Sequence, residues 1–232
     1  NSSTGEIDLA NSPINSYKIF YITSGTCPNS STFDLSVTAA GLANNFSMEF
    51  DGSNYINAGD SDSLNIAGNL TLSAWVFITA GSAYNGIISK RDSGGTNYQL
   101  FTDNSTTPKL RFYDGSTATS STGTVSLNTW HHIAITVNSG VTNGSIFYID
   151  GVQSGTATFT ITNDDAPLII GAINTGSFGS YFNGKIDEVA IWDTDLSATQ
   201  VQSIYDATST NLTKDLTTVA GSNLVYWTRM GD

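Results

Sequence analysis

The sequence predicts an all-β protein, a two-sheet antiparallel sandwich that carries one short helix. Short runs of alternating apolar and polar residues recur along the 232 residues, and Gly, Asn and Asp turn dipeptides separate them. The composition agrees, because Ser, Thr, Asn and Gly are abundant while helix-forming stretches are scarce. Strand follows strand without the strand–helix alternation of a parallel sheet, so the antiparallel sandwich is the expected class.

The net charge of the chain limits the classes of partner that it is expected to bind. Lys and Arg number 8 against 20 Asp and Glu, a formal net charge of −12. Phosphate binding needs Lys and Arg, so we expect no nucleic-acid partner and no anionic membrane. No apolar run approaches the roughly 20 residues that span a bilayer, so we expect no membrane insertion. Free carboxylates suit Ca²⁺, which takes oxygen ligands, and the single cysteine, Cys27, excludes an intrachain disulfide.

Residues 1–42 differ from the remainder and are expected to form a separate small segment. Three short strands are predicted at 3–9, 17–22 and 32–37, with Gly, Pro and Asn between them. The segment resembles the last three strands of an immunoglobulin-like repeat of bacterial and phage surface proteins. Because three strands without partners are marginal alone, we expect the segment either to pack on the main domain or to be the remnant of a longer module. The chain begins at Asn1 without Met, so we expect a fragment or a processed product.

Residues 43–232 are expected to form the main sandwich. The longest clean strand is predicted at 70–78, where every second residue is aliphatic and faces one side. The Asp-Gly dipeptides at 51–52, 114–115 and 150–151 predict turns. The other strands are predicted at 46–52, 55–58, 86–90, 98–101, 110–113, 130–137, 146–152, 168–171, 182–192 and 224–227.

One helix is predicted, and it starts at Leu196. Ser197 can act as its N-cap. Val201, Ile204 and Tyr205 then fall on one face of the helix.

Two adjacent carboxylates, Asp187 and Glu188, lie in a predicted strand that is otherwise largely apolar. Strand alternation would place Glu188 with Ile186 and Trp192 on one face and Asp187 on the other. An unpaired buried charge is very costly, so each carboxylate needs a compensating partner. Lys185, backbone donors or a bound cation could supply one.

Several short motifs occur in one order across residues 45–206. They are Phe50-Asp51-Gly52, Leu72-Ser73-Ala74-Trp75-Val76, Ile88-Ser89-Lys90, Trp130-His131-His132-Ile133-Ala134, Tyr148-Ile149-Asp150-Gly151, Leu168-Ile169-Ile170-Gly171, the run from Phe182 to Trp192, and Leu196-Ser197-Ala198. The ordered set resembles the laminin-G-like, concanavalin A-like jelly-roll family. The resemblance implies a jelly-roll fold for residues 43–232 and a place on an extracellular or virion surface.

The resemblance also implies a structural calcium ion near the Phe-Asp-Gly turn and the Ile-Asp-Glu strand. Asp51 and Asp187 match those motif positions, and Asn54 is a further candidate oxygen ligand. The alternative is that Asp51 only forms a turn and that Asp187 pairs with Lys185 or accepts backbone hydrogen bonds.

Catalysis is not expected from the titratable residues. His131 and His132 are adjacent in a strand, so they point to opposite faces and cannot bind one ion together. Glycan hydrolases of the family neighbourhood use a Glu-x-Asp-x-x-Glu strand, whereas Asp187 and Glu188 are consecutive. The sequence leaves a Ser-His-Asp arrangement open but has no Gly-x-Ser-x-Gly elbow.

Glycan binding is the frequent role of the resembled family and uses aromatic faces and polar loop residues. Five residues in or beside predicted loops are the candidates: Tyr84, Arg91, Asp92, Tyr113 and Tyr181. For each, the alternative is a surface side chain that only caps the core. The first expectation is therefore a non-catalytic, lectin-like module that recognises surface glycans. The alternatives are a structural capsid or fibre module that contacts neighbouring protein subunits, and a glycan-cleaving enzyme.

Overall fold

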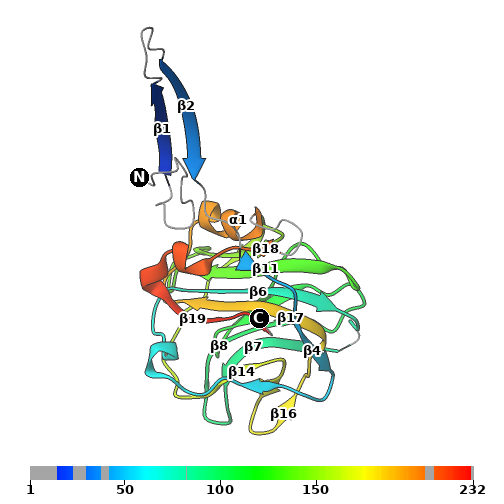
Figure 1. Cartoon of the computed structure of the whole chain (residues 1–232). Coiled ribbons are helices and arrows are strands. Elements are labelled where there is room, and N and C mark those ends of the chain that lie inside the picture. Colours follow the sequence, from blue (N-terminus) through cyan, green and yellow to red (C-terminus); the bar gives the residue numbers. More distant parts are fainter. Residues whose placement is uncertain (1–14, 23–29, 38–41, 82, 207–211, 231–232) are drawn as a thin grey trace. The chain divides into compact units, whose positions relative to one another are not determined.

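A computed structural model describes residues 15–22, 30–37, 42–81, 83–206 and 212–230, and describes side chains within 44–81, 83–206 and 214–230 (Figure 1). The chain divides into two compact units, Asn1–Gly41 and Leu42–Asp232.

In the first unit, β1 (Asn15–Ile22) and β2 (Ser30–Val37) form an antiparallel pair. The strands predicted at 17–22 and 32–37 are confirmed by this pair. The strand predicted at 3–9 lies outside the described residues.

The second unit is an antiparallel β-sandwich with one α-helix. Its strands are β3 (Leu42–Ala43), β4 (Met48–Asp51), β5 (Ile56–Asn57), β6 (Leu70–Ile78), β7 (Asn85–Arg91), β8 (Thr96–Thr102), β9 (Leu110–Tyr113), β10 (Ala118–Ser120), β11 (Trp130–Val137), β12 (Ser145–Ile149), β13 (Val152–Ala157), β14 (Leu168–Ile170), β15 (Ile173–Asn174), β16 (Phe178–Gly179), β17 (Asn183–Trp192), β18 (Leu212–Thr213) and β19 (Leu224–Thr228). The helix is α1 (Ala198–Asp206), and three short 3₁₀ turns are η1 (Asp62–Leu64), η2 (Leu216–Thr218) and η3 (Gly221–Asn223).

Two main sheets make up the sandwich (Figure 1). The six-stranded sheet has the order β10-β9-β8-β7-β14-β5. The seven-stranded sheet has the order β13-β12-β11-β6-β17-β19, and β4 also pairs with β17. Every strand pair in both sheets is antiparallel, so the predicted all-β, two-sheet antiparallel jelly roll with one short helix is confirmed.

The main core lies between the two sheets and follows from strand alternation. In β6, Leu70, Leu72, Ala74, Val76 and Ile78 are all fully buried, as their period of two predicts. They belong to one cluster with apolar residues of the opposite sheet, among them Ile88, Leu100 and Leu168.

A second apolar cluster covers the other face of the seven-stranded sheet and holds α1 there. Trp192 is fully buried in it and donates its indole N–H to the Val219 carbonyl at 2.8 Å. Val201 and Ile204 supply the apolar face of α1, as predicted. The predicted N-cap is confirmed too, since the Gln200 N–H donates to Ser197 Oγ and Ser197 N–H donates back to Gln200 Oε1.

A β-bulge in β17 changes which residues face the main core. The register with β6 shifts between Asp187 and Ala190, and Glu188 has a φ of +50°. Ile186 and Val189 therefore both pack in the main core. The prediction that Glu188 shares a face with Ile186 is wrong, because the extra residue of a bulge reverses the alternation that follows it.

Candidate functional site

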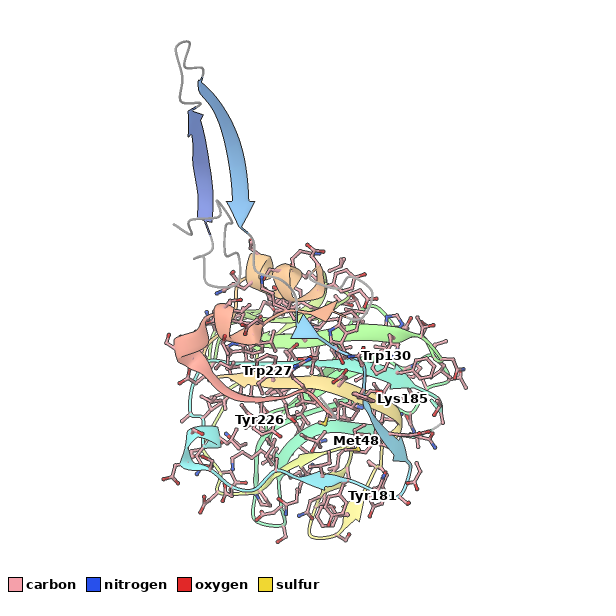
Figure 2. All side chains as sticks on the ribbon, in the orientation of Figure 1. Met48, Trp130, Tyr181, Lys185, Tyr226 and Trp227 are labelled. Carbon is pink, nitrogen blue, oxygen red and sulfur yellow. The ribbon has the colours of Figure 1, made fainter. Side chains whose placement is uncertain are left out.

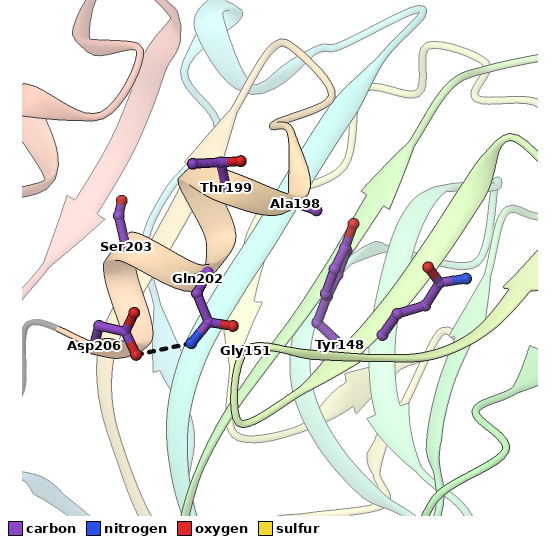
Figure 3. A pocket seen from close by; sticks show the side chains of 8 residues that line it. Tyr148, Gly151, Ala198, Thr199, Gln202, Ser203 and Asp206 are labelled. Atoms are coloured by element: carbon purple, nitrogen blue, oxygen red, sulfur yellow. Dashed lines mark hydrogen bonds between the residues drawn. The ribbon is translucent and has the colours of Figure 1, made fainter.

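A shallow hollow of about 450 Å³ lies between α1 and the β12–β13 hairpin (Figure 3). Its volume falls within the range of small-ligand sites. The residues that line it are Tyr148, Gly151, Gln153, Ala198, Thr199, Gln202, Ser203 and Asp206.

The hairpin turn sets the shape of this hollow. Asp150 and Gly151 have φ values of +52° and +74°, the left-handed pair that a two-residue type I′ turn requires. A Cβ atom at position 151 would lie 2.7 Å from Gln202 Oε1, so the bare glycine lets Gln202 approach the turn. Gln202 Nε2 in turn donates to Asp206 Oδ1 at 2.8 Å, which fixes the polar edge of α1 (Figure 3).

The lining combines an aromatic ring with hydroxyl, amide and carboxylate groups. Tyr148 is buried within the sheet, and burial raises the pKa of its phenol above its ordinary value. Thr199 and Ser203 offer hydroxyls, and Gln153 and Asp206 offer further donors and acceptors. Such a set suits a polar, uncharged ligand that is rich in hydroxyl groups.

A second surface lies on the same sheet, in one row across four strands. The strand register places Trp130 of β11 opposite Phe77 of β6, Phe77 opposite Lys185 of β17, and Lys185 opposite Glu49 of β4. Trp130 is 37% exposed, and its ring centroid lies 5.8 Å from that of Phe77. Figure 2 shows Trp130 and Lys185 on the same side of the molecule.

The neighbouring row of that sheet face is covered by α1. Trp75 stacks on Tyr205 of α1 with 6.0 Å between ring centroids and 20° between ring planes. His132 lies next to Trp75, is fully buried, and contacts Ser73 Oγ through Nε2 at 2.8 Å. The helix thus leaves Trp130 and Phe77 as the more accessible aromatic pair.

The five ligand candidates from the sequence fall into two groups at opposite ends of β7. Arg91 and Asp92 lie at its end, where the Arg91 guanidinium sits 5.2 Å from the centre of the Tyr113 ring. Tyr84 precedes its start, and the backbone near Tyr181 bonds there, since the Gly86 N–H donates to Ser180. The seven extended residues of β7 span roughly 20 Å. The structure therefore brings Arg91, Asp92 and Tyr113 together at one end of the strand. Tyr84 and Tyr181 lie at the other end.

Asp92 and Tyr113 have local roles in the first group. Asp92 Oδ1 accepts the N–H groups of Gly94 and Gly95, at 2.6 and 3.2 Å. The Tyr113 hydroxyl donates to the Gly115 carbonyl at 2.6 Å. At the other end, Tyr84 is 38% exposed and packs its ring against Phe101.

The three metal candidates do not converge. Asp51 lies opposite Asn183, four residues before Asp187 on β17, which corresponds to roughly 13 Å. Asp51 accepts hydrogen bonds from the hydroxyl and N–H of Ser53, which lower its pKa, and its own N–H donates to Asn54. Over the ranges that the structure describes, no three His, Cys, Asp or Glu side chains form a metal-binding group. One calcium ion shared by Asp51 and Asp187 does not fit this geometry.

The two adjacent carboxylates of β17 have protein partners. Asn44 Nδ2 lies 2.9 Å from Asp187 Oδ2 and 3.4 Å from Glu188 Oε1. Glu188 also accepts the indole N–H of Trp227 at 2.6 Å and pairs with Arg229 at 3.3 Å. These contacts compensate both charges at the bulge.

Comparison with known proteins identifies the family to which the fold belongs. The profile described as the concanavalin A-like lectin/glucanases superfamily matches residues 50–202, more than half of the chain. The fold is that of lectin-like β-sandwiches. The chain belongs to the concanavalin A-like lectin/glucanases superfamily. No curated protein matches the sequence.

Three solved structures share this fold at low sequence identity. A heptameric SAP-like pentraxin from Limulus polyphemus is 16% identical with a TM-score of 0.57, covering 72% of this chain and 84% of its own. Domain 4 of the extracellular arabinanase AbnA from Geobacillus stearothermophilus, solved with arabinotriose, is 17% identical with a TM-score of 0.53, covering 84% and 88%. The CBM40 of the Ruminococcus gnavus IT-sialidase, solved with α2,3-sialyllactose, is 14% identical with a TM-score of 0.52, covering 69% and 98%.

Across the described part of the chain, the structure holds no helix with the length and apolarity needed to span a bilayer.

Proposed function

We propose that this protein is a lectin-like module that binds glycans, and that the hollow between α1 and the β12–β13 hairpin is its binding site. The observation that carries the proposal is the lining of the hollow, where hydroxyl, amide and carboxylate groups lie beside the buried Tyr148. The hydroxyls of a sugar can exchange hydrogen bonds with such polar groups. Two of the structural neighbours were solved with oligosaccharides, which supports the proposal.

The aromatic row on the same sheet supports the same function. Trp130 and Phe77 offer a platform for stacking, and Lys185 and Glu49 add one donor group and one acceptor group. These two charges cancel within the row, and the chain as a whole carries −12. The proposed ligand is therefore a neutral glycan.

A glycan array tests the proposal. The wild type is compared with Asp206→Asn, and Asp62→Asn serves as the matched control because Asp62 is an exposed residue of η1. A hydrogen bond to a charged group contributes about 1.5–3 kcal/mol, so Asp206→Asn should weaken binding by about tenfold or more. The control should bind like the wild type. Equal binding by all three proteins would remove the hollow as the site.

A contact surface for neighbouring protein subunits is the second candidate function. Val152 is 66% exposed and lies on β13, an edge strand of the seven-stranded sheet. Exposed edge strands can pair with another chain. A Val152→Lys variant that alters the mass measured by light scattering would favour this function.

The setting in which the module acts is a proposal too. We place it on an extracellular or virion surface, where glycans are displayed. The arabinanase domain among the structural neighbours comes from an extracellular enzyme, which agrees with such a place.

A further inference from the structure

Ser126, His131 and Asp150 form a continuous chain of hydrogen bonds, which ends in the β12–β13 turn at the residue before Gly151 of the hollow. Ser126 Oγ lies 2.6 Å from His131 Nε2, and His131 Nδ1 lies 2.7 Å from Asp150 Oδ2. The second carboxylate oxygen of Asp150 accepts the His132 backbone N–H at 3.0 Å. The order is that of a nucleophile, a base that can take its proton, and a carboxylate that orients the base.

The fold fixes the two acid–base members of this chain. His131 belongs to β11 and is held in the ladder with β6, opposite Val76. Asp150 sits in the tight turn after β12, and its N–H donates to the His132 carbonyl at 2.8 Å. The two side chains are only 12% and 31% exposed, so the ring has little freedom to turn away from the carboxylate.

Ser126 is exposed on a loop that is anchored on both sides. The Val125 N–H donates to Pro108 at 2.7 Å, and the Asn128 N–H donates to Ile78 at 2.8 Å. Within the part of the chain that the structure describes, the N–H groups of Ser126 and Leu127 between these anchors have no hydrogen-bond acceptor. They remain available to an oxygen atom that develops negative charge next to Ser126 Oγ.

We propose that Ser126 is a nucleophile that accepts acyl groups from esters, with His131 as its general base and Asp150 as the positioning residue. Ser126 Oγ forms a bond to the ester carbonyl carbon while the Oγ proton moves to His131 Nε2. The carbonyl electron pair moves to oxygen, facing the N–H groups of Ser126 and Leu127. The bond to the alkoxy oxygen then breaks, and that oxygen leaves as an alcohol with the proton from His131. His131 then takes a proton from water, the water oxygen bonds to the acyl carbon, and the bond to Ser126 Oγ breaks. The acyl group leaves as a carboxylic acid, and the proton on His131 returns to Ser126 Oγ.

The exposed position of Ser126 selects the class of substrate. A surface loop suits a small acyl group, such as acetyl, carried on a larger alcohol. This reactivity does not depend on glycan binding at the hollow, so either proposal can fail without the other.

Labelling with a fluorophosphonate probe tests the proposal, because the reagent marks activated serines by displacement of fluoride. The whole chain is incubated with the probe, and the adduct is located by peptide mass spectrometry. We expect an adduct on Ser126, because His131 takes the Oγ proton as the serine oxygen bonds to phosphorus. His131→Asn should slow labelling by about 100-fold or more.

Matched variants separate reactivity from a purely structural role. Asp150→Asn suits the same left-handed turn, since Asn tolerates positive φ, and should slow labelling by about tenfold or more while the fold persists. Ser53→Ala is the control, because Ser53 also donates to a carboxylate, that of Asp51, in a two-membered pair without an imidazole. It should leave labelling unchanged. A folded wild type without an adduct on Ser126, or labelling that His131→Asn leaves unchanged, would overturn the proposal.

Discussion

Acidification should destabilise this protein through His132. The ring is fully buried between β11 and its neighbours, and burial lowers its pKa to about 4 from the ordinary 6.5, although Asp150 opposes the shift. The folded state therefore favours the neutral ring, and the stabilisation is complete above pH 6.5. It is lost as the pH falls from 6.5 towards 4, because the unfolded chain binds a proton that the folded chain excludes. At pH 5 the loss amounts to about 2 kcal/mol.

Urea unfolding at pH 7 and pH 5 measures this loss. His132→Gln is the reference, because Gln stays uncharged and can still bond to Ser73 Oγ. The wild type should lose about 2 kcal/mol more than the variant between the two pH values. Carboxylates titrate equally in both proteins, so they cancel in the difference. Equal losses in the two proteins would show that His132 is not kept neutral by burial.

Three further predictions concern β17, α1 and calcium. Gly184→Ala should destabilise by more than about 1 kcal/mol in urea unfolding, because φ there is +141° and a Cβ atom would overlap the Phe77 carbonyl oxygen; unchanged stability would contradict the geometry of β17. Ser197→Ala should cost about 1 kcal/mol through loss of the N-cap, and a variant that unfolds at the wild-type urea concentration would refute that role. Excess calcium should leave the melting temperature as it is in chelator, because Asp51 and Asp187 lie too far apart along β17 to share one ion. A higher melting temperature in calcium that Asp51→Asn abolishes would contradict this geometry.

The strands and the helix could be predicted because their signals are local. In β6 the period of two is complete, and the structure has the strand at the predicted residues, Leu70–Ile78. In α1 the Ser197 N-cap and the buried residues Val201 and Ile204 lie within a few residues of each other in the sequence. For each such element, the local sequence is enough to predict which face is buried.

The bulge in β17 could not be predicted, because its cause lies far away in sequence. Glu188 takes a φ of +50°, and its carboxylate is met by Asn44, Trp227 and Arg229. The sequence of β17 itself contains no signal that predicts the extra residue of the bulge. In β17, strict alternation fails at Glu188, where Asn44 contacts both acids.

The candidate site was only partly accessible from the sequence. The hollow joins Tyr148 and Gly151 to Gln202 and Asp206, which lie about 50 residues further along the chain, and no sequence motif links the two segments. Tyr84 and Arg91 both flank predicted loops, but they lie at opposite ends of one strand. The Ser126–His131–Asp150 chain could not be predicted, because it joins a surface loop, a strand and a hairpin turn that no sequence motif links.

The most direct test of glycan binding at the hollow is an amide NMR titration with the strongest neutral glycan from the array. Glycan binding at the hollow should produce shift changes that saturate and are concentrated in the β12–β13 turn around Gly151 and in α1 (Ala198–Asp206). Saturating changes confined to other parts of the sandwich, or no changes at millimolar glycan, would contradict binding at the hollow.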